Sequence, residues 1–404
     1  MNKDIYPIID YSISQSKPDI ALRKSLKDFY FNDGRLLVIA VGKASWLMAK
    51  TFSELTDKKI DTGIVITKYH HCLGNIEGFE IYEAGHPVVD ENSLFASRKV
   101  LAVTRNLNRN DDVIFLLSGG GSALFEDTDI DLNYLQQINA RLLYSSASIE
   151  EINTIRKRLS NVKGGKFARH CYPATVHNYI LSDVISDKLD SVASGPTVND
   201  STTKQQVVEI NNKYSLQLPE SVINNDTIND LNNIKTTVIG SVKILADKVQ
   251  EICTKLGYQT SIIDDGVDYD CRLLCDRLIS LAFDNQNPFS KLAFIFTGEI
   301  TLQVDGQGRG GRNQHLALLC AERIKDFNNT TVLCVGSDGS DGPTEAAGGY
   351  VDNNTFKKAL SLGLDIDKCL KNYDSYNCLK KLDQLIVTGP TNTNVNDFYL
   401  LLIK

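Results

Sequence analysis

A run of three glycines between two serines is the first candidate for chemistry in this sequence. The run consists of Ser118, Gly119, Gly120, Gly121 and Ser122. It follows an apolar stretch, residues 114–117, of the kind that forms a strand buried on both faces. Glycine tolerates a sharp turn and lets the backbone approach a ligand closely, and exposed N–H groups in such a turn bind phosphate or carboxylate. The alternative is a strand-to-helix turn without a ligand, and the loop lacks the lysine of a Walker A loop.

A lysine follows a second apolar run. Residues 35–41 predict a buried strand that ends at Gly42, and Lys43 opens the helix that comes next. An ammonium group at a helix N-terminus faces an unfavourable dipole, so an anion is expected beside it. A solvated lysine in the first helical turn is the alternative.

Two arginines stand among the glycines of residues 305–315. Arg309 and Arg312 carry guanidinium groups, which bind oxyanions through two parallel hydrogen bonds. The glycines around them allow tight folding of the backbone. We interpret this segment as an oxyanion-binding loop, with a flexible surface loop as the alternative.

Aspartates follow two further predicted strands. Asp183 and Asp187 come after residues 175–181, and Asp338 and Asp341 come after residues 331–335. Magnesium takes one or two carboxylates together with water and phosphate oxygens. These four aspartates are therefore the candidate metal ligands. Asp338 and Asp341 flank glycines, so a sugar hydroxyl is the alternative ligand for that pair.

A capping box, Ser148 with Glu151, predicts a helix that runs to residue 158. Five basic side chains lie on its end and just beyond it: Arg156, Lys157, Arg158, Lys163 and Lys166. They predict either a local positive surface or an ordinary solvated helix face.

The elements that must position these residues are alternating strands and helices, with the glycine-rich loops at strand ends. This pattern is typical of α/β domains with a ligand cleft between them. A chain of 404 residues exceeds one ordinary core, so we expect two domains. The polar, Asn-rich stretch 199–234 suggests a boundary, with domains at 1–234 and 235–404. An alternative left open is that the last strand returns to the first domain.

The composition and the absence of certain motifs disfavour several classes of protein. The net charge of −7 and a pI of about 5.5 disfavour nucleic acid as a partner. No apolar run is long enough to span a membrane, and the N-terminus lacks an apolar signal region, so we expect a cytoplasmic protein. The nine cysteines include no CxxC pair, which indicates reduced thiols. The sequence also contains no GxSxG or HExxH motif, and only VGKAS follows the first strand, where a dinucleotide enzyme would carry GxGxxG.

Six segments together carry a family resemblance. They are LLSGGGSAL at 116–124, INTIRKRLSNVKGGKFA at 152–168, SVASGPTV at 191–198, GRGGRNQ at 308–314, GSDGSDGPTEAAGGYVD at 336–352 and TNVNDF at 393–398. In this order they resemble the class II glycerate kinases, or glycerate 2-kinases. This family has a C-terminal domain named MOFRL after its sequence motif, and its members were formerly named hydroxypyruvate reductases.

The resemblance implies a fold and a reaction. It implies an α/β protein with a Rossmann-like three-layer parallel-sheet domain, a smaller α/β domain and an active site in the cleft between them. It also implies a transferase that uses ATP and Mg²⁺ to convert glycerate into 2-phosphoglycerate and ADP. Glycerate and ATP are then the expected partners, and we expect a monomer or a homodimer.

The resemblance also assigns roles to residues. It implies that Lys43 is catalytic and that an arginine of the glycine-rich loop, Arg309 or Arg312, is essential; we favour Arg312 because it opens a helix. We expect Asp183 to accept the proton of the 2-hydroxyl group. Substrate contacts are expected from residues 118–122, Arg156 and Asn313, and the magnesium ligands from Asp183, Asp187, Asp338 and Asp341.

The sequence departs from the family pattern at two places, and two alternative functions are open. His315 stands where the family is expected to have an acidic residue, and residues 185–189 lack the expected Gly-Asp-Asp turn, which affects the metal assignment. The main alternative is an NAD(P)H-dependent hydroxypyruvate reductase, which the missing dinucleotide motif disfavours. A second alternative is a non-catalytic sensor of sugar acids, which the many charged loops disfavour.

Overall fold

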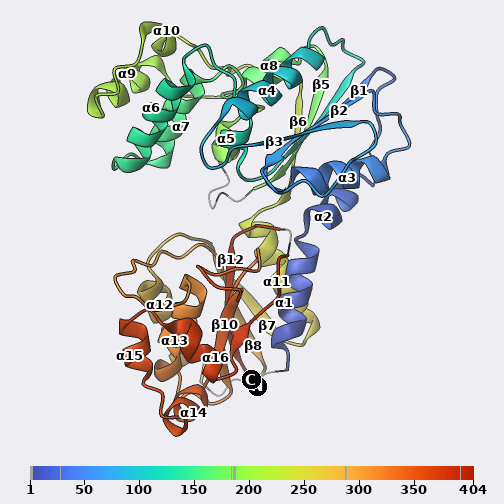
Figure 1. Ribbon diagram of the computed structural model, residues 1–404. Helices are drawn as coiled ribbons and strands as arrows, with labels where there is room; N and C mark the ends of the chain where they lie inside the picture. Colours follow the sequence, from blue (N-terminus) through green and yellow to red (C-terminus); the bar gives the residue numbers. More distant parts are fainter. Residues whose placement is uncertain (1–2, 28, 183, 185–187, 287–288, 392) are drawn as a thin grey trace. The chain divides into compact units, whose positions relative to one another are not determined.

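The chain folds into two compact units. The computed structural model describes residues 3–27, 29–182, 184, 188–286, 289–391 and 393–404. One unit comprises Ala21–Ile239 and is called the N-terminal unit here. The other comprises Met1–Ile20 together with Gly240–Lys404 and is called the C-terminal unit. Each unit has its own six-stranded sheet (Figure 1).

The sheet of the N-terminal unit has the strand order of a Rossmann fold. In spatial order its strands are β3 (Phe79–Ala84), β2 (Thr62–Lys68), β1 (Leu36–Val41), β4 (Asp112–Leu117), β5 (Thr175–Leu181) and β6 (Ile234–Gly240). The strands from β3 to β5 pair in parallel. Both β1 and β4 are buried along their whole length, as their apolar runs predicted. The order 3-2-1-4-5-6 confirms the predicted Rossmann-like domain.

The helices of this unit fall into two groups. Around the sheet lie α3 (Ser45–Leu55), α4 (Glu91–Val103), α5 (Gly121–Leu124), α8 (Lys166–His170) and the short 3₁₀ helix η1 (Leu189–Ser194). A separate helical cluster, which Figure 1 shows beside the sheet, contains α6 (Leu132–Tyr144), α7 (Ile149–Leu159), α9 (Lys204–Lys213) and α10 (Glu220–Ile223). This cluster has its own apolar core. The predicted capping box begins α7, because Ser148 and Glu151 each bind the backbone N–H of the other.

The sheet of the C-terminal unit is mixed. In spatial order its strands are β11 (Leu385–Ile386), β10 (Gly348–Asp352), β9 (Thr330–Gly336), β12 (Asp397–Ile403), β8 (Leu292–Gly298) and β7 (Gln259–Val267). Only β7 and β8 pair in parallel; the other pairs are antiparallel. The last strand, β12, is fully buried between β8 and β9, so it belongs to this unit.

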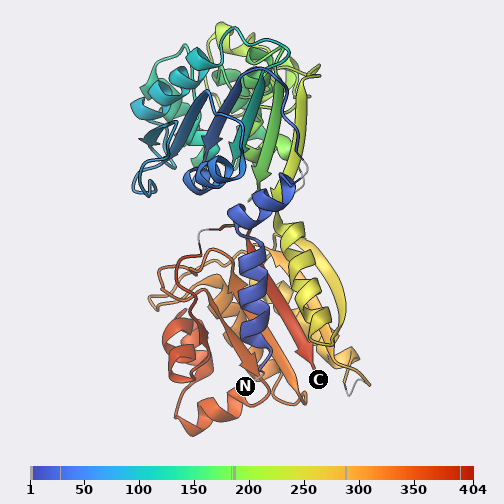
Figure 2. The ribbon, with the colours of Figure 1, turned by 90° about the vertical axis from the view of Figure 1, so that its right-hand side faces the viewer.

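The N-terminal helix packs in the C-terminal unit. The helices of this unit are α1 (Ile5–Gln15), α11 (Val242–Lys255), α12 (Cys271–Asp284), α13 (Arg312–Arg323), α14 (Thr355–Ser361), α15 (Ile366–Lys371) and α16 (Ser375–Lys381); α2 (Pro18–Ser25) crosses the boundary between the units. Figure 2 shows α1 beside α11, and Tyr11 donates a hydrogen bond of 2.5 Å to Glu251 there. The predicted first domain, 1–234, therefore differs from the structure, in which residues 1–20 pack with the C-terminal unit. The apolar face of this helix predicts burial, but it does not indicate which of the two cores the helix packs against.

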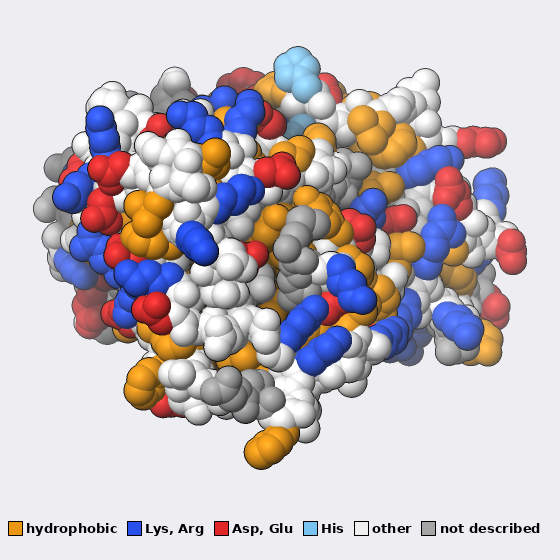
Figure 3. Space-filling model, turned by 90° about the horizontal axis from the view of Figure 1, so that it is seen from below, with side chains coloured by type: hydrophobic (Ala, Val, Ile, Leu, Met, Phe, Trp, Pro, Cys, Tyr) orange, Lys and Arg blue, Asp and Glu red, His pale blue; other side chains and the backbone are white. Residues whose placement is uncertain are grey.

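The surface agrees with the composition. Basic and acidic side chains are interspersed on the face drawn in Figure 3. None of the described helices is both long enough and apolar enough to cross a membrane.

Candidate active site

The sheet of the N-terminal unit brings Lys43 to the glycine-rich loop. The strand order reverses between β1 and β4, and ligands of such sheets bind at this point. The Lys43 N–H donates to Gly119 O at 2.9 Å, and the Ala44 N–H donates to Ser118 Oγ at 3.0 Å. Two segments that lie more than 70 residues apart in sequence therefore form one edge of the sheet.

Close packing explains two of the glycines at this edge. A Cβ atom at Gly42 would lie 2.2 Å from Ser118 Oγ, and one at Gly120 would lie 3.3 Å from Lys43 Cγ. Gly42 and Gly120 also have φ angles of 121° and 92°, which favour glycine. The Ser118 hydroxyl is engaged with the loop after β1, so Ser118 builds the edge and points its oxygen into the protein.

A pocket of about 620 Å³ lies beside this loop in the N-terminal unit. Gly119, Gly120 and Ser122 line it, together with Arg156 from α7. Its remaining polar lining includes His86, Glu126, Gln136, Asn139 and Ser191, among apolar side chains. Three of the predicted substrate contacts of the loop thus share one pocket with Arg156, whereas Ser118 and Gly121 do not line it.

Arg156 carries a charge that the protein does not neutralise directly. Its Nε donates to the amide oxygen of Asn139 at 2.9 Å, and it forms no ion pair with the carboxylates of the described residues. Burial lowers the pKa of Arg156, and the nearby Glu126 opposes this effect. A half-buried guanidinium without a carboxylate partner favours an anionic ligand.

The other members of the basic cluster serve the fold. Lys157 pairs with Asp200 at 2.6 Å and with Asp190 at 2.9 Å. Arg158 pairs with Asp226, Lys163 pairs with Glu126, and Lys166 donates to backbone carbonyls. Lys157, Arg158 and Lys163 are almost fully buried. The cluster is therefore neither a positive surface nor a solvated helix face, and only Arg156 lines the pocket.

His86 is a neutral polar group in the same pocket. Burial, followed by the charge of Lys43, lowers the pKa of His86 to about 4. Its ring lies 3.0 Å from the position that a Cβ atom on Gly120 would take. His86 therefore offers the pocket an uncharged imidazole near pH 7.

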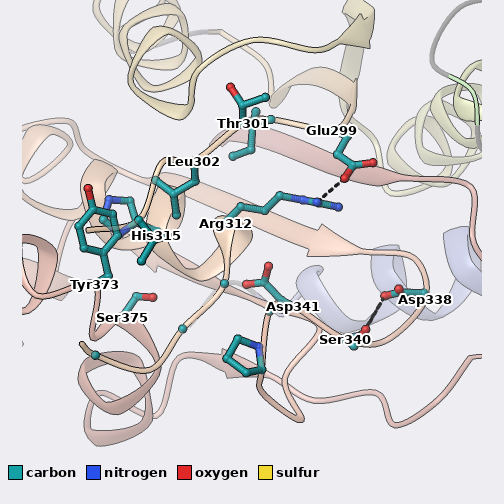
Figure 4. A pocket seen from close by; sticks show the side chains of 17 residues that line it. Glu299, Thr301, Leu302, Arg312, His315, Asp338, Ser340, Asp341, Tyr373 and Ser375 are labelled. Carbon is teal, nitrogen blue, oxygen red and sulfur yellow. Dashed lines mark hydrogen bonds and ion pairs between the residues drawn. The ribbon is translucent and has the colours of Figure 1, made fainter. Parts of the chain in front are cut away.

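A second pocket, of about 640 Å³, lies within the C-terminal unit (Figure 4). Arg312, the first residue of α13, points into it. Its Nε donates to Asp397 at 2.6 Å and its Nη1 to Glu299. Burial opposes the charge of Arg312, but these two carboxylates raise its pKa overall. Its Nη2 makes no hydrogen bond to any described residue, so one donor edge remains for a ligand.

Arg309 lies away from this pocket. Its Nη2 donates to Glu345 at 2.6 Å, and its guanidinium lies 4.3 Å from the ring centroid of Tyr376. The neighbouring glycines are required by packing: a Cβ atom would lie 2.4 Å from Asn372 O at Gly308 and 2.2 Å from Asp341 Cγ at Gly311. The structure thus brings Arg312, and not Arg309, to the pocket.

The predicted metal ligands have different environments. Asp341 accepts from the N–H groups of Asn313 and Gln314 at 3.1 and 2.8 Å, so it caps α13. Burial raises the pKa of Asp341 to about 6, against these hydrogen bonds. Asp338 is exposed and lines the pocket, where it accepts from Ser340. Asp183 and Asp187 lie outside the described residues, and in the described part of the chain no three His, Cys, Asp or Glu side chains gather as a metal site.

Asn313 has a structural position. It is 1% exposed, it is not part of the pocket lining, and its N–H binds Asp341. Sequence analysis missed Glu299 and Asp397, which hold Arg312, and Glu126, which lines the first pocket. A signal was present for the first two, since Glu299 directly follows β8 and Asp397 lies in the TNVNDF segment.

The fold and the two pockets define a two-unit α/β protein in which one arginine lines a pocket in each unit. Two family models match this chain: DUF4147, a domain of unknown function, over residues 4–225, and the MOFRL family over residues 292–397. The chain belongs to the glycerate 2-kinase family, the class II glycerate kinases, as its motifs predicted.

Named relatives support this membership. The chain is 44% identical to the D-glycerate 2-kinase of Thermotoga maritima, over 98% of this chain and 97% of that protein. It is 36% identical to a glycerate 2-kinase of Pyrococcus horikoshii, over 92% and 88%. A crystal structure of glycerate kinase from Thermotoga maritima matches with a TM-score of 0.93, covering 98% of each chain at 43% identity. A relative from Agrobacterium vitis, 34% identical over 98% of this chain and 93% of that protein, bears a provisional hydroxypyruvate reductase name.

Proposed function

We propose that this protein transfers the terminal phosphoryl group of ATP to the 2-hydroxyl oxygen of glycerate. The products are 2-phosphoglycerate, ADP and the proton released from that hydroxyl group. The observation that carries the proposal is the placement of Arg156 in a pocket with the glycine-rich loop, because a small hydroxy acid needs a cation for its carboxylate and donors for its oxygens.

In this proposal the N-terminal unit binds the acceptor. Arg156 binds the carboxylate of glycerate through the nitrogens that Asn139 leaves free. Gly119, Gly120 and Ser122 offer backbone N–H groups and a hydroxyl to the remaining oxygens. Lys43, held beside Gly119, supplies positive charge to the transferred phosphoryl group.

The C-terminal unit contributes Arg312, whose position is determined by Asp397 and Glu299. A phosphoryl transfer spreads negative charge over the equatorial oxygens, so a fixed guanidinium stabilises the transition state. Mg²⁺ bound to the ATP phosphates would neutralise part of the charge, and Asp338 is the described aspartate that fits it, since it is exposed and lines the pocket. Asp341 does not fit, because its oxygens cap α13. Asp183 stays our candidate for accepting the hydroxyl proton.

The test is an incubation of the full chain with ATP, Mg²⁺ and D- or L-glycerate, followed by phosphorus NMR of the products. We expect 2-phosphoglycerate and ADP in equal amounts. The appearance of 3-phosphoglycerate alone would contradict the proposed regiochemistry. A Lys43→Ala variant should lose about 10²–10³-fold in kcat; near-normal turnover would remove Lys43 from the mechanism.

A hydroxypyruvate reductase activity is the competing proposal. The turn between β1 and α3 reads VGKAS and lacks the glycine fingerprint that binds a dinucleotide pyrophosphate. We therefore expect no change in nicotinamide absorbance with hydroxypyruvate and NADH or NADPH. A cytoplasmic location and a monomeric or homodimeric state remain predictions; light scattering of the purified protein tests the second.

A further inference from the structure

The pocket of the C-terminal unit has two chemically different ends. Arg312, Glu299, Asp338 and Ser340 form a charged end, and Leu302, His315 and Tyr373 gather at the other (Figure 4). Val304 also lines the pocket and is 58% exposed, so it offers apolar surface for a ligand to cover. A nucleotide has the same division, with a flat aromatic base at one end and phosphates at the other.

The aromatic end is built from two parallel rings. The rings of His315 and Tyr373 have centroids 5.1 Å apart and planes inclined by 16°. Burial lowers the pKa of His315 to about 4, so the imidazole is neutral near pH 7 and does not repel the nearby Arg272. His315 Nδ1 is buried and has no hydrogen-bond partner among the described residues.

The backbone holds Tyr373 in an unfavourable conformation to place its ring there. Its φ angle is 57°, which is rare for a bulky side chain. The turn is fixed by a hydrogen bond of 2.7 Å from the Gly308 N–H to Asn372 O. A Cβ atom at Gly306 would lie 2.8 Å from Tyr373 Cδ2. The loop at residues 305–315 therefore packs directly against the segment that carries the Tyr373 ring.

We propose that this pocket binds the nucleoside of the phosphoryl donor, with a purine ring packed against the Tyr373–His315 pair and Leu302 and the phosphates directed toward Arg312. The inference rests on the proposed function for the identity of the donor. It also gives a role to the histidine at position 315, where the family resemblance led us to expect an acidic residue: a neutral imidazole ring can stack in this aromatic end, whereas a carboxylate cannot.

The test measures ADP binding to the full chain by isothermal titration calorimetry. Tyr373→Asn removes the ring and keeps a residue that tolerates positive φ. We expect it to weaken ADP binding about five- to twentyfold, while Tyr373→Phe stays within twofold of the wild type. Pyrophosphate, which lacks a base, should bind the wild type and Tyr373→Asn equally.

A matched control lies in the other pocket. Tyr144, which lines the pocket of the N-terminal unit, is 93% exposed. Tyr144→Asn should leave ADP binding unchanged. Weaker ADP binding in Tyr144→Asn together with wild-type binding in Tyr373→Asn would overturn the proposal and place the base in the N-terminal unit.

The outcome is separable from that of the proposed function. Loss of ADP affinity in Tyr373→Asn supports the subsite even if the wild type fails to phosphorylate glycerate. Conversely, 2-phosphoglycerate formation with unchanged KM for ATP in Tyr373→Asn upholds the kinase activity and overturns the subsite. In the supporting case the KM for ATP rises with the dissociation constant of ADP, and the KM for glycerate does not change.

Discussion

The two basic clusters of this protein differ in how they treat their charges. In the N-terminal unit, α7 and the residues after it carry five cations, of which Arg156 alone lines the pocket. In the C-terminal unit, the loop at residues 305–315 carries Arg309 and Arg312, and only Arg312 lines the pocket of that unit. Each cluster therefore presents one arginine to a pocket, and its other cations bond to groups of the protein itself.

The partners of these two arginines give them different roles. Arg312 is held by two carboxylates, so its charge is already balanced and its position is well determined. Arg156 is held by a neutral amide, so its charge remains to be balanced by a ligand. From this comparison we expect Arg156 to contribute affinity for an anionic substrate and Arg312 to contribute a fixed donor to the transition state.

The largest effect is expected for a cation that serves the fold. Lys157→Met leaves the buried carboxylate of Asp200 without its partner and should lower the free energy of unfolding by about 3–5 kcal/mol. Urea denaturation measures this loss, and Lys157→Met/Asp200→Asn should recover part of it. A stable Lys157→Met variant with a raised KM for glycerate would contradict the division of roles within α7.

Arg312→Lys should lower kcat about 100-fold. A lysine cannot bridge Asp397 and Glu299 and still present a planar donor to the pocket. The KM for glycerate should change little. Arg309→Lys is the matched control, because Arg309 is paired with Glu345 outside the pocket lining, and it should keep kcat within about twofold. Equal losses in both variants would erase the distinction between the two arginines.

Arg156→Met should raise the KM for glycerate about 10- to 100-fold, the cost of one charge-assisted hydrogen-bonded contact. The free energy of unfolding should stay the same or increase, since the variant removes a half-buried cation that has no carboxylate partner. Steady-state kinetics and urea denaturation of the same preparation check both statements. A destabilised variant with an unchanged KM would show that Arg156 belongs with the structural cations.

The smallest effect concerns pH and Asp341. The pKa of Asp341 is raised to about 6 in the folded protein, above the ordinary value of 3.8, so the folded state binds the proton more tightly than the unfolded state. Its contribution therefore lowers the free energy of unfolding as pH rises from about 4 to about 6, by about 1–3 kcal/mol. The Asp341→Asn variant should lack this part of the pH dependence. Parallel stability curves for the two proteins would exclude it.

Much of the fold followed from local pattern. The sequence predicted the buried strands β1 and β4, the capping box of α7 and the series of family motifs. Each of these depends on residues that are close together in sequence. The position of α1 could not be predicted from the sequence. Its buried face, formed by Ile5, Ile8, Ile9 and Ile13, predicts a helix against some core, but the packing partner α11 lies more than 200 residues away.

For the candidate site, the sequence by itself determined which residue types were present and which family they belong to. Only the tertiary structure decided which cations line a pocket. Lys157 and Asp200 are 43 residues apart, and Arg312 and Asp397 are 85 apart, so nothing near either cation in sequence shows that it is paired. The physical reason is that burial and ion pairing depend on the neighbours that folding brings together, and these neighbours give Arg156 a neutral amide partner among the described residues instead of a carboxylate.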